Sequence, residues 1–404
     1  MWRLKYINDA ILDFISPILD SLDRKRFTIV LFLDLKCAFD SIDIDILLNK
    51  MNHYGFRDSS NRFFKSYFSD RYQFVNISDF NSNHKRVNIG LTQGAINSPQ
   101  LFHIFINDLA NFSISHGFYP TLFADDAVFQ CSGSTLEDVI YKLNYFIPNL
   151  SEWLAMNRLT PNVSKTKLML FSHVNIVDPP DVYFNNTKLE FVHNFKYLGV
   201  FIDDCLNFRH HTRYLTTKVN QVLGVVRVSA PYFNVPALKT IYYSLVYCLI
   251  SQSIIIYGKT FATYVKPIKV AINKILRVIL KVGRDCNNVP LMSTNAMFYA
   301  LNILKFDNIC TYFLLKFLRK SLFSDDNNDF SDFIPNHDHQ TRNFNLILPS
   351  VRLDIQKNSA IFQAIYHFNT LPPYLKVPMS DFKFKSLFNK MILDSYQNIE
   401  CFNV

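Results

Sequence analysis

A strongly apolar segment that ends at one acidic residue constrains this chain more than any other feature. Phe27–Leu33 reads FTIVLFL and is followed directly by Asp34. A short run of aromatic and branched aliphatic residues predicts a strand that is buried on both faces. A helix is expected next, capped by Asp40 or Ser41 and stopped by Gly55. An ionised carboxylate is therefore expected at the end of a buried strand.

The rest of the sequence divides into a mixed region and a helical region. Strand-like patterns recur up to about residue 203, and the segment 121–130 reads as strand, acidic turn, strand. The other elements expected there are a strand at Arg71–Ile77, a helix at Leu136–Met156 and strands in Val182–Asp203 with a turn at Asn185 and Asn186. Helices are predicted for Arg209–Ala230, Leu238–Tyr257 and Tyr264–Val282. The acidic, Asn-rich stretch 324–340 reads as an exposed loop.

Composition and charge exclude several classes of protein. Hydrophobic residues make up 49% and charged residues 19%, which excludes an intrinsically disordered chain. Phe and Tyr are encoded by AT-rich codons, so an AT-rich coding sequence explains the 39 Phe and 21 Tyr ahead of any function. The 42 basic and 33 acidic residues give a net charge of +9, which favours a polyanionic partner only mildly.

Cysteine spacing indicates the redox environment of the chain, and hydropathy indicates whether a segment spans a membrane. The seven cysteines are scattered and no CxxC pair occurs, so we expect no zinc site and a reduced, intracellular environment. Ile241–Tyr257 is apolar but somewhat short for a membrane span of about 20 residues. It also carries Ser244, Ser251, Gln252 and Ser253. A buried helix and no membrane partner are predicted.

Three local sequence features contain polar residues that are candidates for catalysis or metal binding. They are LDLKCAFD around Asp34, the stretch GLTQGAINSP from Gly90, and FADD, which ends in Asp125 and Asp126. Each is weak alone, because Asp is common in turns for structural reasons. Burying an ionised carboxylate is costly unless a cation or donor meets it. If Asp34 and Asp125 converge, a pair of Mg²⁺ ions would compensate both, since Mg²⁺ binds to one or two carboxylates plus substrate phosphates.

In this order and spacing, the three features resemble the catalytic motifs of reverse transcriptases, specifically those of non-LTR (LINE-type, jockey-like) retrotransposons. Downstream, Asn162, Lys165 and Thr166 look like the family's Asn-x-x-Lys-Thr, and FKYLGVFID looks like its primer-gripping hairpin. IIIYG, ILRVIL, TRN and FNTLPPYLK resemble its C-terminal region. The resemblance implies an α+β fold: a right-hand polymerase palm with partial fingers over 1–203, a helical thumb over 204–290, and a helical C-terminal region over 291–404.

The resemblance also implies a catalytic centre. Asp34 and Asp125 would be shared ligands of two Mg²⁺ ions, for which Mn²⁺ could substitute. Asp126 would support them, and the backbone carbonyl of Leu35 would complete one shell. Lys165 would protonate the pyrophosphate leaving group, although a solvated surface lysine is the alternative.

Substrate contacts follow from the same resemblance. Phe39 would lie under the sugar and exclude a 2′-hydroxyl, with core packing as its alternative role. Gln93 and Gly94 would contact the incoming nucleotide and the template. The residues expected to hold the primer end are Tyr197, Leu198 and Gly199. The basic segment Arg209–Arg227 is the expected nucleic-acid contact, or else a solvated helix face.

The chain also departs from the family's pattern. Thr92 stands where Pro is usual, and Phe123 where Tyr is usual. Asn97 and Ser98 replace a Gly-rich turn, so Ser98 is expected at a backbone angle easier for Gly. Only 33 residues precede Asp34, too few for the family's fingers, so weak activity in isolation is expected. Neither an endonuclease nor a ribonuclease H pattern is seen.

The function expected from the sequence is RNA-directed DNA polymerisation on an RNA template, with a DNA primer, deoxynucleoside triphosphates and Mg²⁺. The rival interpretation is a truncated or domesticated fragment that binds nucleic acid without catalysis. The sequence does not indicate a localisation, although retrotransposition requires access to the nucleus.

Overall fold

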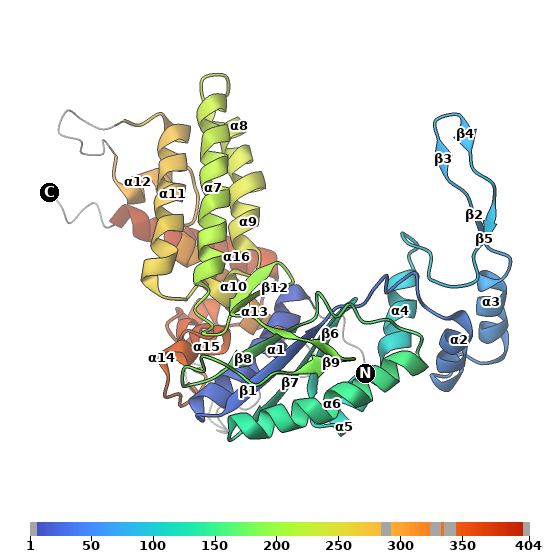
Figure 1. The fold of residues 1–404 in the computed structure, drawn as a ribbon. Helices are drawn as coiled ribbons and strands as arrows, with labels where there is room; N and C mark the ends of the chain where they lie inside the picture. The colour runs from blue at the N-terminus through green and yellow to red at the C-terminus, as the bar shows by residue number, and fades with distance from the viewer. Residues whose placement is uncertain (1–5, 284–291, 324–332, 335–344, 399–404) are drawn as a thin grey trace. The chain divides into compact units, whose positions relative to one another are not determined.

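In the computed structural model the apolar segment Phe27–Leu33 is β1, the middle strand of a five-stranded sheet (Figure 1). The strand order is β11-β8-β1-β7-β6, and β1 runs antiparallel to both of its neighbours. The other strands are β6 (Tyr119–Phe123), β7 (Asp126–Gly133), β8 (Lys167–Phe171) and β11 (Glu190–Phe191). Six of the seven β1 residues are buried, as predicted.

The structure describes residues 6–283, 292–323, 333–334 and 345–398. The chain forms two compact units, the first covering Asp13–His193 and the second beginning at Asn194. Helix α1 (Ile7–Asp23) is divided, because Ile7–Leu12 clusters with the second unit. The sheet belongs to the first unit.

Helices cover both faces of the sheet. One face packs on α4 (Ser98–Ile106), α5 (Asp108–Ser115) and α6 (Leu136–Met156). Its core joins alternate residues of β1 and β7, such as Leu31 and Phe129, to Phe146 of α6. On the other face, Phe14 of α1 contacts Phe32. Helix α6 has the bounds that the sequence predicted, and the side chain of Thr135 caps it.

The helix after β1 begins later than expected. Helix α2 (Ile44–His53) is capped by Asp43, whose carboxylate accepts a hydrogen bond from the Ile46 amide at 3.0 Å. The prediction of Asp40 or Ser41 as the cap was wrong, because both amides bond back to the Cys37 carbonyl in a preceding turn. Gly55, with φ of 94°, does follow the helix end.

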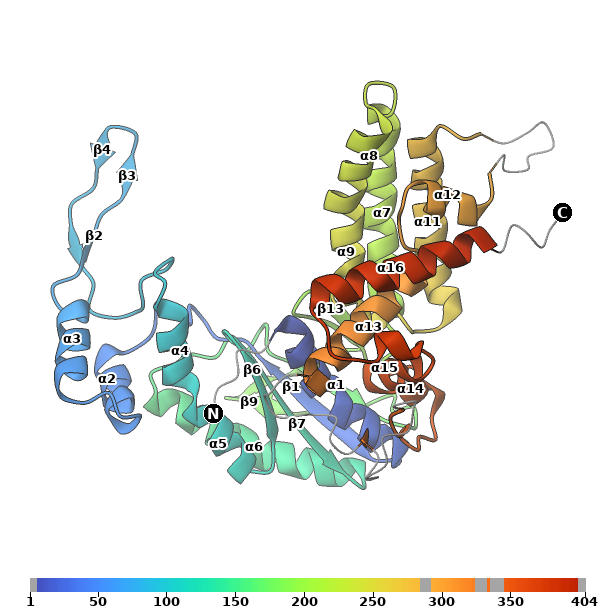
Figure 2. The same cartoon turned by 180° about the vertical axis from the view of Figure 1, so that it is seen from behind.

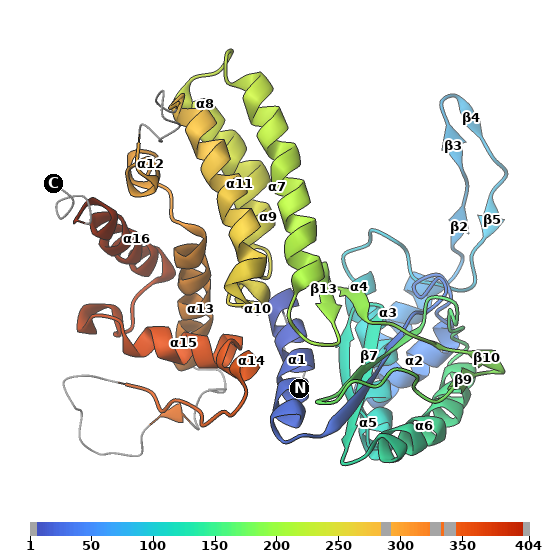
Figure 3. The same ribbon diagram turned by 60° about the vertical axis from the view of Figure 1, so that its left-hand side comes forward.

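A long hairpin follows α3 (Asp58–Phe68), and Figure 3 shows it extending beyond that helix. Its strands are β2 (Tyr72–Gln73), β3 (Asn76–Ile77), β4 (Phe80–Asn81) and β5 (Lys85–Arg86). The strand predicted at Arg71–Ile77 is thus two short exposed pieces. A second hairpin joins β9 (Tyr183–Phe184) to β10 (Thr187–Lys188), and its turn is the predicted pair Asn185 and Asn186, both with positive φ.

The second unit begins with a hairpin and continues as helices. Strands β12 (Asn194–Tyr197) and β13 (Val200–Asp203) precede α7 (Arg209–Ser229), which packs beside α11 (Ala262–Leu280) in Figure 3. Between them lie α8 (Val235–Ile241), a π-helix (Tyr242–Tyr247), α9 (Cys248–Ser251) and α10 (Ile254–Tyr257). The single helix predicted at Leu238–Tyr257 was wrong, because Gln252 is extended and Ser253 is left-handed, with φ of 54°.

Within the part of the chain that the structure describes, no helix is long and apolar enough to span a bilayer. The apolar segment 241–257 is instead divided among the short helices named above, and Ile254, Ile255, Ile256 and Tyr257 are buried.

The C-terminal part of the second unit is made of helices (Figure 2). They are α12 (Thr294–Ala300), α13 (Phe306–Phe323), α14 (Asp354–Lys357), α15 (Ala360–Asn369), a 3₁₀ turn (Pro373–Leu375) and α16 (Asp381–Asn398). Arg319 of α13 is 4% exposed and donates hydrogen bonds to the carbonyls of Leu375, Val377 and Met379. Apart from residues 333 and 334, the loop predicted near 324–340 lies outside the described residues.

Candidate active site

A tight hairpin turn places two of the predicted carboxylates. Strands β6 and β7 pair antiparallel with Phe123 opposite Asp126, so Ala124 and Asp125 form a two-residue turn. Ala124 has φ of 52°, a conformation that costs an L-residue about 1 kcal/mol or more. Asp125 is exposed in this turn, and Asp126 is the first residue of β7.

Strand register brings Asp34 to the same place. Leu33 at the end of β1 lies opposite Ala127 of β7. Asp34 and Asp126 lie just beyond this last pair, and the charge of Asp34 acts on Asp126. The structure therefore gathers Asp34, Asp125 and Asp126 at one end of two adjacent strands, and we call these three residues the carboxylate cluster.

The carboxylate cluster carries uncompensated negative charge. The pKa of Asp126 is raised, first by burial of its carboxyl group and then by the charges of Asp125 and Asp34. None of the three is in an ion pair with another described residue. Like charges held together in this way favour a bound cation.

The backbone beside Asp34 offers a further oxygen. Leu35 forms an isolated antiparallel bridge with Pro161, which has no amide hydrogen to donate. The neighbouring bonds run from Lys36 N to Thr160 O and from Asn162 N to Asp34 O, at 2.9 and 2.7 Å. The Leu35 carbonyl accepts no hydrogen bond from the residues that the structure describes. It is free to act as a ligand.

These groups fit a metal ion that takes only some of its ligands from the protein. Among the described residues, no three His, Cys, Asp or Glu side chains lie close enough to hold a metal ion by themselves. Mg²⁺ is usually bound by one or two carboxylates and completes its octahedral shell with water and substrate phosphates. The cluster and the Leu35 carbonyl match that donor set, which is all oxygen.

The loop of the second motif lies against the turn of the first. The amides of Gly90 and Leu91 donate to the carbonyls of Ile42 and Phe39, each at 2.8 Å. Gln93 donates to both carboxylate oxygens of Asp40 at 2.9 and 3.1 Å. The structure therefore brings the first two motifs together through backbone contacts.

Gly94 and Phe39 have different surroundings. Gly94 has φ of 83°, and a β-carbon there would meet no atom within 4 Å, so the backbone is open to a close approach. Phe39 is half-buried and stacks on Phe102 of α4, with ring centroids 4.7 Å apart. Its ring is thus fixed by core packing while part of it stays accessible.

The expectation for Ser98 was wrong. Its φ is not positive, and it is the first residue of α4 with ordinary helical backbone. Its hydroxyl donates to the Thr92 carbonyl at 2.6 Å, and the Asn97 amide oxygen accepts from Tyr67 at 3.2 Å. Side-chain hydrogen bonds therefore close this loop.

Lys165 lies in the turn before β8. Its side chain is exposed and makes no ion pair with a described residue. The turn is closed by bonds from the Lys165 and Thr166 amides to the Asn162 carbonyl at 3.1 and 2.9 Å. The Lys165 ammonium group therefore has no ion-pair partner among the described residues.

The predicted primer-grip residues belong to the second unit. Tyr197 ends β12 with a buried side chain, so its backbone rather than its ring would reach a primer. Leu198 and Gly199 form the turn to β13, with φ of 46° and 87°. The hairpin is supported by α7, where burial and then Lys196 lower the pKa of His211 to about 4. The neutral imidazole accepts from the Phe201 amide at 3.4 Å.

Two site residues were missed or misplaced by sequence reasoning. Asp40 was expected to cap a helix, but it holds Gln93, which lies 53 positions away. No local pattern signals such a pair. His211 was grouped with the basic face of Arg209–Arg227, yet it is 3% exposed and faces the hairpin. The helical spacing of His211 with buried Leu215 and Val219 could have identified it as a core residue.

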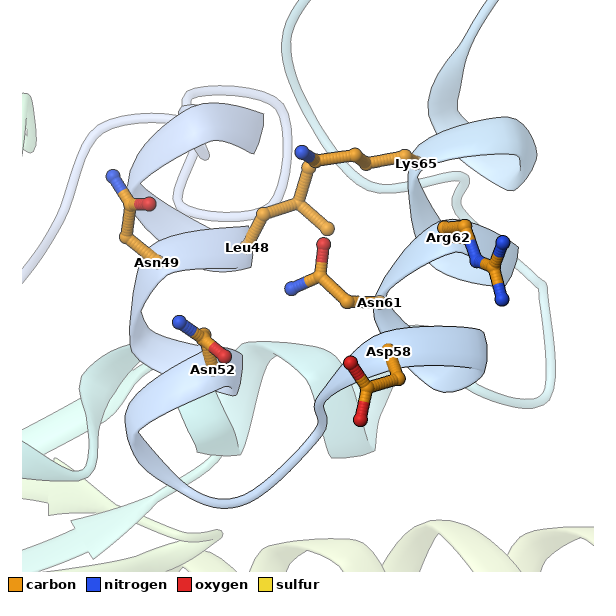
Figure 4. A pocket seen from close by; sticks show the side chains of 7 residues that line it. All are labelled: Leu48, Asn49, Asn52, Asp58, Asn61, Arg62 and Lys65. Atoms are coloured by element: carbon orange, nitrogen blue, oxygen red, sulfur yellow. The ribbon is translucent and has the colours of Figure 1, made fainter.

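A cavity of about 580 Å³ lies elsewhere in the first unit, between α2 and α3 (Figure 4). Apart from Leu48, the side chains that line it are polar or charged: Asn49, Asn52, Asp58, Asn61, Arg62 and Lys65. None of the predicted site residues lines it.

Comparison with known proteins agrees with the geometry. The family model described as reverse transcriptase (RNA-dependent DNA polymerase) matches residues 3–202. The RNA-directed DNA polymerase from mobile element jockey of Drosophila funebris is 26% identical over 273 residues, covering 65% of this chain and 29% of that protein. The Pol polyprotein from the type-1 retrotransposable element R1 of Bradysia coprophila is 27% identical over 208 residues, covering 50% of this chain and 20% of that protein.

The chain spans less than a third of the length of either relative. Among solved structures, apo telomerase from Candida tropicalis overlaps 68% of this chain and 45% of that chain, with a TM-score of 0.39 and 13% identity. With its carboxylate cluster at the ends of β1 and β7 and the family match over residues 3–202, the chain belongs to the reverse transcriptase family, among relatives from non-LTR retrotransposons.

Proposed function

We propose that the chain catalyses RNA-directed DNA synthesis. A primer 3′-hydroxyl attacks the α-phosphorus of a deoxynucleoside triphosphate, a new phosphodiester forms, and pyrophosphate leaves. The partners would be an RNA template, a DNA primer and the four deoxynucleotides. The observation that carries this proposal is the gathering of Asp34, Asp125 and Asp126 with no described cation to neutralise them.

Members of this family generally use divalent metal ions. We assign two Mg²⁺ ions, replaceable by Mn²⁺, to the carboxylate cluster. Asp34 and Asp125 would be the shared ligands, with Asp126 in support and the Leu35 carbonyl completing one shell. When bound, such ions neutralise phosphate charge and activate the attacking hydroxyl.

The remaining residues would position the substrates. Gln93 and Gly94 would contact nucleotide and template, and the open space at Gly94 supports this. Phe39 would lie under the sugar. The free ammonium group of Lys165 would give a proton to the departing pyrophosphate. The primer end would be held by the turn at Tyr197, Leu198 and Gly199.

A primer-extension assay tests the proposal directly. Purified protein, a DNA primer annealed to RNA, deoxynucleotides and Mg²⁺ should yield a product that DNase degrades and that fails to form when the metal is chelated. Binding of the primer–template without extension would contradict the proposal and favour the non-catalytic fragment.

Phe39→Ala is expected to admit ribonucleotides, because the aromatic ring would no longer block the 2′ position. Discrimination against ribonucleotides should fall about tenfold or more, which corresponds to roughly 1.4 kcal/mol. The measurement is the ratio of kcat/KM for the two nucleotide types. Phe39→Tyr keeps the ring and should keep the ratio. An unchanged ratio in Phe39→Ala would assign the ring to stacking on Phe102 alone.

Binding to a primer–template is expected to weaken steeply with salt, because Lys and Arg contacts release condensed counterions. Arg209, Arg213, Lys218 and Arg227 are exposed along α7 and make no ion pair with a described residue. Arg213→Ala should lower the slope of log affinity against log salt by about one.

The matched control is Lys385→Ala, which removes the same charge from an exposed position on α16. It should leave the slope unchanged. Equal effects of the two substitutions would mean that net charge rather than α7 sets the binding, and a flat dependence in the wild type would contradict nucleic-acid binding itself.

A further inference from the structure

Thr166 makes two hydrogen bonds that the catalytic assignment does not use. Its side chain is 1% exposed and lies one residue before β8. The hydroxyl accepts from the Asp34 amide at 3.3 Å and donates to the Asn162 carbonyl at 3.0 Å. A threonine hydroxyl has one donor and two acceptor positions, so both bonds form together.

The same turn also holds the other side of Asp34. The Asn162 amide donates to the Asp34 carbonyl at 2.7 Å. Both backbone polar groups of Asp34 are thus bonded to the turn 162–166. The turn is itself rigid, because Ser164 donates to the Asn162 side-chain oxygen at 2.9 Å and two amides bond to the Asn162 carbonyl.

These bonds begin where the sheet stops supporting β1. The ladder with β7 ends at the pair Leu33 and Ala127, and the ladder with β8 ends at Phe32 and Lys167. Asp34 is the first residue beyond both ladders. Without the turn it would begin a loop, and its carboxylate would be free to swing away from Asp126.

We propose that Thr166 is a positioning residue for Asp34, and that its hydroxyl fixes the direction in which the Asp34 carboxylate enters the carboxylate cluster. This role rests on the proposed polymerase function. A displacement of about 1 Å in a reacting group can lower a rate about a hundredfold, so a hydroxyl that holds a metal ligand has a measurable effect.

The test compares two substitutions that differ in the hydroxyl. Thr166→Val keeps the shape and removes the hydroxyl, whereas Thr166→Ser keeps the hydroxyl. We expect Thr166→Val to lower kcat for nucleotide addition about tenfold or more with little change in KM, and Thr166→Ser to stay within about threefold of wild type. Equal losses in both variants would mean that packing of the methyl group, and not the hydroxyl, matters, and would overturn the proposal.

Two readouts do not depend on activity. Binding of Mn²⁺ alone to the full chain, followed by electron paramagnetic resonance, should weaken several-fold in Thr166→Val and not in Thr166→Ser. Hydrogen exchange at the Asp34 amide should accelerate in the same variant only. Unchanged exchange at this amide in Thr166→Val would overturn the proposal.

Separate controls distinguish a loss of folding from a loss of function. If Thr166→Val fails to fold, as thermal unfolding would show, Thr166→Ala takes its place, because the smaller side chain lets water reach the Asp34 amide. An inactive wild type in which the hydroxyl still controls exchange at Asp34 would end the polymerase proposal while leaving the structural role of Thr166 intact.

Discussion

Replacing Asp125 by Asn is expected to abolish nucleotide addition while leaving the fold and RNA binding intact. The substitution removes one anionic ligand of the metal ions that we assign to the carboxylate cluster. Those ions would then be held less well and would stabilise less of the phosphate charge in the transition state. Losses of this type are about 10²- to 10³-fold in kcat, or roughly 3–4 kcal/mol. Asp125 is exposed in a two-residue turn, and turns favour Asn as well as Asp. Thermal stability should therefore change little.

Two controls sharpen this experiment. Asp126→Asn should lower activity less, because Asp126 only supports the ligands. Asp178→Asn removes an exposed carboxylate outside the cluster and should have no effect on kcat. Activity near the wild-type level in Asp125→Asn would remove the cluster from the mechanism, whereas loss of folding would show that the turn needs this side chain.

Gly90→Ala is expected to be the most destabilising small substitution in the first unit. Gly90 has φ of 83°, and a β-carbon there would lie 2.7 Å from the Asp40 carbonyl oxygen. A left-handed Ala costs about 1–2 kcal/mol, and the clash with fixed backbone adds about 1–3 kcal/mol. The midpoint of urea unfolding measures the sum, and activity should fall with it, because the Gly90 and Leu91 amides hold the second motif on the first.

The chain offers a matched control for this prediction. Gly94 has the same φ of 83°, but a β-carbon there would meet no atom within 4 Å. Gly94→Ala therefore reports backbone strain alone and should lower stability by about 1–2 kcal/mol. Equal unfolding midpoints for the two variants would show that the loop moves freely away from Asp40.

Elements with a strong local pattern were predictable from the sequence. The apolar run of β1 and the periodic run of α6 have the predicted bounds, because burial on two faces or one face imposes a local period. The Asn185 and Asn186 turn followed from the tolerance of Asn for positive φ. Helix starts were less certain, since Asp40, Ser41 and Asp43 are all capable caps and only the turn on Cys37 decides among them.

Local sequence was enough to show that Asp34 follows a buried strand and that Asp125 lies in a turn, because hydrophobic period and turn chemistry act over a few residues. Which distant groups meet depends on how the whole chain folds. Strand register ended with Leu33 opposite Ala127 and so brought Asp34 near Asp126, and the Thr166 hydroxyl reached the Asp34 amide across 132 positions of chain. Such contacts depend on pairing between remote segments, whose geometry no short stretch of sequence encodes.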